Sequence, residues 1–266
     1  MMSLELAVLL DAPVRVRVGN ACPTWKGAVQ TESGVSTEAY LKAVPSEQLL
    51  AEAFCAILGR EAGLPVPPPY LVEDQGGFLG SEPEALGHTL FFGSGALEFP
   101  SFAHYLTENL PTEDERIYEI LRRLAAWKHF HAAIAFDEWI ANGDRHLDNL
   151  LYGGGDGITL IDHSHALGEP GWSVQGLEPA RRTGNQLAEW LKFQGEVAMQ
   201  TFKRALPTVV GGFAQCPIDT AWDQAQSDRY AAAQWREMVI DFLEKRLSGL
   251  DIMLDGLLRD QGWMLR

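Results

Sequence analysis

The sequence predicts an α+β protein of two lobes, in which a strand-rich lobe precedes a mostly helical one. Three observations support this prediction. Short strand patterns gather in the first part of the chain, helical periodicity takes over from Ser101 on, and one hairpin pattern interrupts the helical half. With 266 residues the chain can bury a sizeable core. We expect the lobes to span residues 1–95 and 96–266.

The first lobe is expected to hold several strands. The segments typical of strands are LELAVLL (4–10), VRVRV (14–18), AYLKAV (39–44), YLV (70–72) and GFLG (77–80). Residues 19–37 are rich in Gly, Thr, Ser and Pro and leave room only for a short strand near Ala28 and Val29. Residues 81–100 are rich in Gly and Glu, so we expect them to connect the lobes.

One helix belongs to this first lobe. It should follow Pro45, with Ser46 as its N-cap. Apolar residues keep helical spacing from Leu49 to Leu58, and Gly63 is a stop signal.

The second lobe is predicted to be helical apart from one hairpin. Thr112 and Glu115 have the spacing of a capping box, and helical periodicity continues from there to about Asn142 with one break. The apolar runs NLLY (149–152) and ITLID (158–162) flank a glycine-rich loop, which is typical of a hairpin. The chain after residue 171 is again helical. The aromatic residues expected in the core are Trp127, Phe130, Trp139 and Phe242.

The composition limits the class of function. A formal net charge of −15 repels phosphate backbones, so general nucleic-acid binding is not expected. The chain has no apolar run long enough for a membrane span and no signal-peptide pattern. Its three cysteines are scattered and not at metal-ligand spacing. We therefore expect a cytoplasmic protein with reduced thiols.

Polar residues converge at one end of the predicted hairpin. Asn149 begins its first strand, Asp162 ends its second, and Asp144 lies on the preceding loop. Carboxylate and amide oxygens suit Mg²⁺, which keeps room for phosphate oxygens. The spacing from Asp144 to Asn149 is that of the protein-kinase catalytic loop, in which a later aspartate binds the main Mg²⁺. Kinases also need a strand lysine and a helix glutamate, and Lys42 and Glu52 occupy such places.

At these residues the sequence resembles the HipA-like kinases, and more distantly the phosphoinositide 3/4-kinases. The resemblance rests on NGDRHLDN followed by LIDHSHAL, and on YLKAV followed by LLAEAFCAILGREAGLPVPPPYLV. It covers roughly residues 38–72 and 136–168. It implies a bilobal protein-kinase-like fold that binds ATP and Mg²⁺ between its lobes.

The resemblance also implies residue roles. Lys42 would bind phosphates and Glu52 would orient it. Asp144 would be the catalytic aspartate, and the Mg²⁺ ligands would be Asn149 and Asp162. Arg145 and His146 would complete the ATP-binding loop, as structural groups or, for His146, by orienting the substrate or the γ-phosphate.

The sequence departs from the kinase pattern in its phosphate-covering loop. It contains no G-x-G-x-x-G, so this loop must come from around Gly19 to Gly27, with Ser33-Gly34 as the next candidate. The metal aspartate is followed by His-Ser, which fits the HipA-like and lipid kinases better than eukaryotic-type protein kinases.

The favoured function is an ATP- and Mg²⁺-dependent kinase acting on a protein Ser or Thr, with autophosphorylation as one form of that activity. A lipid or small-molecule hydroxyl is the second acceptor class. A nucleotide-binding module that acts through a regulatory partner protein is another alternative, although Lys42, Asp144, Asn149 and Asp162 are all present.

Two weaker readings concern other polar residues. A zinc or di-metal hydrolase is suggested by the histidines His129, His131, His146, His163 and His165. An i,i+2 pair on a helix, however, points to different faces. We therefore expect His129 and His131 to be packing or surface residues. Arg181 and Arg182 lie where an activation segment would be and are expected to be solvated, with contact to an acidic or phosphorylated group as the alternative.

Overall fold

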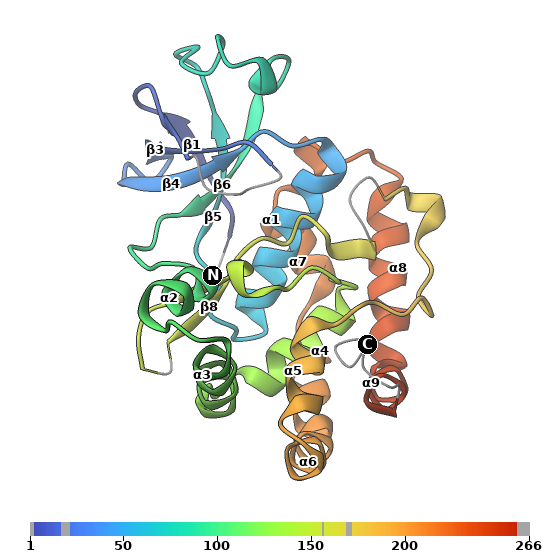
Figure 1. The fold of residues 1–266 in the computed structure, drawn as a ribbon. Coiled ribbons are helices and arrows are strands. Elements are labelled where there is room, and N and C mark those ends of the chain that lie inside the picture. Colours follow the sequence, from blue (N-terminus) through green and yellow to red (C-terminus); the bar gives the residue numbers. More distant parts are fainter. Residues whose placement is uncertain (1–2, 17–21, 156, 169–171, 260–266) are drawn as a thin grey trace.

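The computed structural model describes residues 3–16, 22–155, 157–168 and 172–259. Its first part is a sheet with one long helix (Figure 1). The elements are β1 (Glu5–Leu9), β2 (Val14–Arg15), β3 (Thr24–Thr31), β4 (Ser36–Lys42), α1 (Ser46–Glu61), β5 (Pro69–Glu73), the short 3-10 helix η1 (Pro83–Ala85) and β6 (Leu90–Gly95).

The sheet of this lobe closes on itself. Its strand order is β1-β5-β6-β4-β3-β2, and β1 also pairs with β3. The β1–β5 pair is parallel and the other pairs are antiparallel. Closure pairs Ala7–Leu9 of β1 with Val29–Thr31 of β3, and the short β2 pairs with Trp25 and Lys26 on the same edge of β3. Lys42 is the last residue of β4, so the sheet fixes its backbone on both sides, against Thr24 and Phe92.

Several predicted elements of this lobe are confirmed and others are wrong. The strands at 4–10, 39–44 and 70–72 are confirmed as β1, β4 and β5. Residues 17 and 18 of the predicted second strand lie outside the described residues. The segment 77–80 forms turns and not a strand, because the Asp74 carboxylate accepts the backbone N–H groups of Phe78 and Leu79. Ser46 is the first residue of α1 and not its N-cap, which is Pro45.

Strand β6 was not expected from the sequence, and β3 is longer than expected. The short strand expected near Ala28 and Val29 is confirmed as part of the eight-residue β3, and the predicted connector 81–100 contains β6. β6 lies between β5 and β4 near the centre of the sheet. A Cβ atom on Gly93 would meet Val72 Cγ2 at 2.8 Å, so the close approach of the strands requires glycine there. The glycines that suggested a loop are therefore part of a buried strand.

The second part of the chain is helical and contains one hairpin. The helices are α2 (Phe102–Asn109), α3 (Glu113–Ala126), α4 (Phe130–Trp139), α5 (Gln186–Phe193), α6 (Glu196–Phe213), α7 (Ile218–Gln224), α8 (Trp235–Ser248) and α9 (Leu250–Arg259). The hairpin consists of β7 (Leu150–Tyr152) and β8 (Ile158–Leu160), and the 3-10 turns are η2 (Leu147–Asn149), η3 (Ala166–Gly168), η4 (Val174–Gly176) and η5 (Ser227–Arg229). The capping box at Thr112, the break before α4 and the hairpin are confirmed.

The helical lobe packs around α4. All eight residues from Ala133 to Ile140 are buried, and Trp139 Nε1 donates to the Leu243 carbonyl of α8 at 3.0 Å. The aromatic core predicted from helical spacing is confirmed, since Trp127, Phe130, Trp139 and Phe242 are all buried. These contacts fix α4 within the core of the helical lobe. The loop that follows α4 carries polar residues of the candidate site.

The two parts of the chain are joined at α1 and the hairpin. Figure 1 shows α1 between the sheet and the helices, with α7 beside it. The N–H of Leu160 in β8 donates to the carbonyl of Pro65 at 2.8 Å, which ties the hairpin to the segment after α1. Leu4 N–H donates to Gln224 at the end of α7. The boundary between the two lobes, expected between residues 95 and 96, stays a prediction. Within the described residues, no helix is both long and apolar enough to cross a membrane.

Candidate active site

The first cluster of the candidate site joins strand β4, helix α1 and the end of the hairpin. Lys42 Nζ lies 2.6 Å from Glu52 Oε1 and 2.7 Å from Asp162 Oδ2. The second Glu52 oxygen, Oε2, accepts the N–H of His163 at 2.8 Å. Three residues that the sequence placed in one site are thus in direct contact. The Glu52 side chain is completely buried, whereas Asp162 keeps 28% of its side-chain surface.

Burial and the two ion pairs set the charge states of this cluster. Burial opposes the ammonium of Lys42, but Glu52 and Asp162 outweigh it and raise the pKa of Lys42. Burial likewise opposes the Asp162 carboxylate, but Lys42 and the hydrogen bonds from Ser164 lower the pKa of Asp162 below its usual value. For Glu52 burial dominates and raises the pKa. Lys42 is therefore a fixed cation and Asp162 a fixed anion at neutral pH.

The backbone of Asp162 is held in an uncommon conformation. Its φ is 60°, in the left-handed region that aspartate tolerates better than most residues. Ser164 donates to Asp162 Oδ1 through its hydroxyl at 2.6 Å and through its N–H at 3.2 Å. The carboxylate is thus fixed by contacts on both oxygens.

The second cluster lies on the loop between α4 and the hairpin. Asn149 donates its Nδ2 to the Asp144 carbonyl at 2.7 Å and more weakly to Asp144 Oδ2 at 3.4 Å. The Asn149 carbonyl accepts the N–H of Ile161, the residue before Asp162, at 3.1 Å. The hairpin therefore brings the two predicted metal ligands to the same end, Asn149 just before β7 and Asp162 two residues after β8. The Asp144 side chain keeps 34% of its surface exposed.

Two histidines flank the Asp144 carboxylate. His146 Nε2 lies 3.7 Å and His165 Nε2 3.8 Å from Asp144 Oδ2. His146 also caps η2, since its Nδ1 accepts the N–H of Asp148. His165 was not among the kinase site residues expected from the sequence. The signal was its position, three residues after the predicted metal aspartate.

Arg145 lies behind the loop and not in the site. Its side chain is completely buried against the buried carboxylate of Asp137, at 3.1 Å. The NH1 group donates to the backbone carbonyls of Ile161 and Asp162. Arg145 thus ties the loop between α4 and the hairpin to the segment after β8. Asp137 is the partner that the sequence analysis did not identify.

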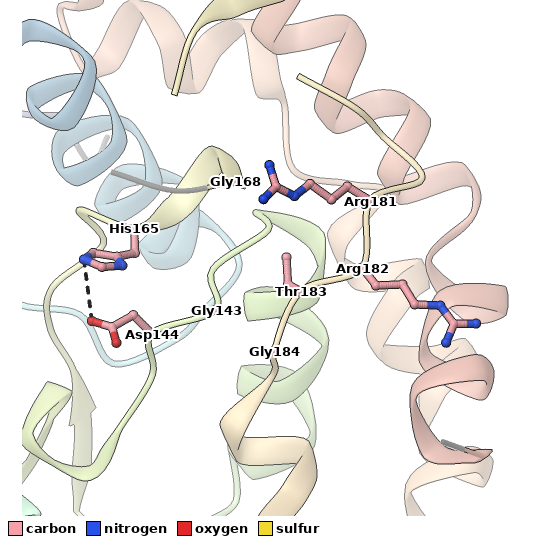
Figure 2. A pocket seen from close by; sticks show the side chains of 8 residues that line it. All are labelled: Gly143, Asp144, His165, Gly168, Arg181, Arg182, Thr183 and Gly184. Atoms are coloured by element: carbon pink, nitrogen blue, oxygen red, sulfur yellow. Dashed lines mark ion pairs between the residues drawn. The ribbon is translucent and has the colours of Figure 1, made fainter. Parts of the chain in front are cut away.

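A cavity of about 220 Å³ opens beside Asp144 (Figure 2). Its lining residues come from the catalytic loop, from the segment after Asp162 and from the segment before α5: Gly143, Asp144, His165, Gly168, Arg181, Arg182, Thr183 and Gly184. Figure 2 shows the Arg181 side chain directed toward Gly168 and the Arg182 side chain directed away from the cavity. The cavity gives the Asp144 carboxylate room to meet a second molecule.

The residues at the hairpin fit a divalent cation of the Mg²⁺ type. Asp162 offers a carboxylate, and Asn149 offers its amide oxygen because its Nδ2 is committed to Asp144. Mg²⁺ is bound in proteins by one or two such oxygen ligands together with phosphate oxygens. Part of the predicted phosphate loop, residues 19–21, lies outside the described residues. Gly27 lies within β3, and Ser33-Gly34 forms the turn between β3 and β4.

The zinc alternative finds no support in the described residues, where no three His, Cys, Asp or Glu side chains gather as a metal site. His129 is the N-cap residue of α4. The His131 ring packs edge-on against Phe202 with 5.3 Å between ring centroids. His129 makes no capping hydrogen bond with its side chain, His131 is a packing residue, and burial lowers the pKa of His131.

Comparisons with known proteins agree with this geometry. Residues 39–175, just over half of the chain, match the model of a family described as HipA-like kinase. No curated protein matches. A Helicobacter pylori proinflammatory kinase, CtkA, has a similar structure, with a TM-score of 0.60 and 12% identity over 96% of this chain and 99% of that chain. A structure of the open conformation of CtTel1 gives a TM-score of 0.47 at 12% identity, covering 91% of this chain and 12% of that chain.

The likeness to CtkA confirms the predicted α+β, kinase-like fold and, at its low identity, speaks for the fold alone. The family match covers β4, α1, the catalytic loop and the hairpin, which hold both clusters of the site. The chain belongs to the HipA-like kinase family.

Proposed function

We propose that this protein transfers the γ-phosphate of ATP, in the presence of Mg²⁺, to a serine or threonine hydroxyl of a protein, its own chain included. The observation that carries the proposal is the contact of Lys42 with both Glu52 and Asp162. This contact places a fixed cation next to the carboxylate that fits a metal. A site of this kind neutralises nucleotide phosphates.

Each residue of the two clusters then has a role. Lys42 binds phosphate oxygens and Glu52 holds its ammonium in place. Asn149 and Asp162 would hold Mg²⁺, which supplies positive charge to the phosphates when bound. Asp144 accepts the proton of the acceptor hydroxyl while the acceptor oxygen bonds to the γ-phosphorus and the bond from that phosphorus to the β-phosphate oxygen breaks, releasing ADP.

The test is transfer of labelled γ-phosphate from Mg·ATP to the protein and to Ser/Thr peptides, beside Asp144→Asn and Asp162→Asn. Asp148→Asn is the matched control, because it lies on the same loop with 65% of its side chain exposed. We expect transfer to fall about 100-fold or more in Asp144→Asn, the usual weight of a general base. The control should keep the wild-type rate.

Thermal unfolding with and without Mg·ATP separates binding from transfer. Ligand at about 100 times its Kd stabilises a protein by about 2.7 kcal/mol. We expect this shift in wild type and Asp144→Asn, and its loss in Asp162→Asn or when EDTA removes Mg²⁺. A shift without transfer in wild type would favour the nucleotide-binding module instead. Unchanged transfer in Asp144→Asn would contradict the proposal.

A further inference from the structure

We propose that the cavity beside Asp144 is an acceptor subsite in which Arg181 recognises an acidic side chain next to the accepting Ser or Thr. The inference rests on the proposed function and adds a substrate class to it, namely acidic peptides. It assigns Arg181 as a residue that determines specificity, apart from the groups that bind ATP.

The position of Arg181 is the first argument. The cavity has Asp144 and His165 on one side and the segment Arg181–Gly184 on the other. Figure 2 shows the Arg181 side chain directed toward Gly168, across the cavity from the chain that carries Asp144. A peptide whose hydroxyl meets Asp144 must therefore place neighbouring side chains against Arg181. The volume of about 220 Å³ suits a short side chain such as Asp or Glu.

The wall that carries Arg181 is anchored to the core. The Arg181 carbonyl accepts NH1 of the buried Arg246 at 2.9 Å. Two residues on, Thr183 donates its hydroxyl to Glu138 at 2.9 Å. The buried Asn185 then donates its Nδ2 to the Ile134 carbonyl of α4 at 2.8 Å. A side chain on an anchored backbone loses less freedom on binding than one on a free loop, so it can select a partner.

Charge is the third argument. The chain carries a net charge of −15, so a guanidinium directed across the site stands out against the field of the whole protein. That field is screened within about 8 Å at physiological salt, so the local cation decides what binds. A guanidinium fits a carboxylate with two parallel hydrogen bonds. The Asp144 carboxylate, on the opposite side of the cavity from Arg181, repels an acidic side chain of the peptide. The acidic side chain must therefore face Arg181, which sets the direction of the bound peptide.

Arg181 already makes contacts of its own. An acidic peptide replaces these contacts of Arg181 with a new one. The net gain in binding free energy is therefore small, and it is measured as a preference among peptides and not as high affinity. Arg182 is the natural comparison, because it has the same chemistry one residue on. Its side chain is directed away from the cavity, and a Cβ atom added to Gly256 in α9 would lie 3.5 Å from its guanidinium.

The test is a positional-scanning peptide array with a fixed Ser/Thr centre. Each flanking position is fixed in turn as Asp/Glu, as Asn/Gln or as Lys/Arg, and phosphate transfer from Mg·ATP is measured. Wild type, Arg181→Ala, Arg181→Glu and Arg182→Ala are compared. Each variant is first shown to have the wild-type shift in melting temperature with Mg·ATP, which establishes that it is folded and binds nucleotide.

We expect wild type to favour Asp/Glu over Asn/Gln by about tenfold at one or more positions, the size expected of a charged hydrogen bond. In Arg181→Ala this ratio should fall to near one at those positions. In Arg181→Glu it should reverse in favour of Lys/Arg. Arg182→Ala should keep the wild-type ratio.

Other results overturn the inference in distinguishable ways. A wild-type enzyme that phosphorylates peptides without acidic preference, or whose preference survives in Arg181→Ala, leaves Arg181 without the assigned role. Autophosphorylation or ATP turnover with no transfer to any peptide overturns the inference and leaves the phosphotransferase standing. Transfer to phosphoinositide in lipid vesicles, with none to peptides, assigns the cavity to a lipid headgroup. Absence of both turnover and an Mg·ATP melting shift removes the proposed function and the inference with it.

Discussion

Lys42 donates its ammonium across 2.6 Å to Glu52, whose side chain is completely buried beneath the sheet. The contact joins the last residue of β4 to the second turn of α1. A buried carboxylate is costly unless it is paired, so this pair fixes the position of the lysine as long as α1 stays packed on the sheet. The same ammonium also reaches Asp162 at the end of the hairpin.

The first prediction concerns this pair. Lys42→Met should lower kcat/KM for Mg·ATP by about 100-fold or more, because no cation remains to meet the phosphates. Glu52→Gln should fold, because it removes a buried carboxyl group whose pKa is raised by burial. The variant should transfer phosphate more slowly, because Lys42 is less firmly held. Lys203→Met is the control, as Lys203 of α6 pairs with Asp255 of α9 in the helical lobe. Equal activity in Lys42→Met and Lys203→Met would contradict the prediction.

The second prediction concerns Arg145 and Asp137, both completely buried. Arg145→Met should lower the free energy of unfolding by about 3–5 kcal/mol, because it leaves a carboxylate buried without its partner. It should also weaken Mg·ATP binding, since the Arg145 guanidinium holds the Asp162 carbonyl. Urea unfolding and the Mg·ATP melting shift measure the two effects.

Arg122→Met is the control for the second prediction. Arg122 also pairs with an acid, Glu119, but keeps 47% of its side-chain surface exposed. Exposed pairs contribute about 1 kcal/mol or less. Equal losses in the two variants would mean that burial does not set the cost at Arg145.

The third prediction is a pH dependence of stability at His131. Burial lowers the pKa of this imidazole in the folded protein, so the folded state binds its proton less readily than the unfolded state does. Stability from this group is therefore present above the unfolded pKa of about 6.5 and is lost as pH falls below it. In His131→Gln, the free energy of unfolding should fall less between pH 7 and pH 5 than in wild type. Parallel curves for wild type and His131→Gln would refute the assignment.

The sequence predicts the strand of Lys42, the helix of Glu52 and the hairpin correctly, because each has a local pattern that its neighbours in the chain determine. Strand β6 was not predicted, because Gly93 and Gly95 are typical of loops. In the fold, the absence of their side chains lets Val72 of β5 lie close to Gly93 and Pro68 lie close to Gly95. Sequence spacing also places Asp144, Asn149 and Asp162 in one region. Their roles in binding and catalysis stay predictions.

The rest of the site depends on contacts between distant parts of the chain. Asp137 lies within the helix before the loop, and nothing in its local pattern distinguishes it from a surface aspartate. The wall at Arg181 is set by Arg246, which is 65 residues further along the chain. Such long-range anchoring leaves no local pattern in the sequence, so the cavity was not predictable.

The fourth prediction tests that anchor. The buried guanidinium of Arg246 donates to the carbonyls of Pro179 and Arg181 at 2.8 and 2.9 Å and pairs with Glu138 at 3.0 Å. Arg246→Met should lower the free energy of unfolding by about 3–5 kcal/mol, because Glu138 loses its buried partner. Amide hydrogen exchange in residues 179–185 should rise more than in the rest of the helical lobe, since the two carbonyls lose their donor.

Two further variants separate charge from geometry at this anchor. Arg246→Lys keeps the positive charge but cannot bridge Glu138 and two carbonyls with one ammonium, so exchange in 179–185 should be intermediate. Lys245→Met, at the exposed neighbour on the same helix, should exchange like wild type. If Arg246→Met leaves exchange in 179–185 unchanged while stability falls, Arg246 supports only the helical core. The backbone at Arg181 must then be held by its other contacts, among them those of the neighbouring Thr183 and Asn185.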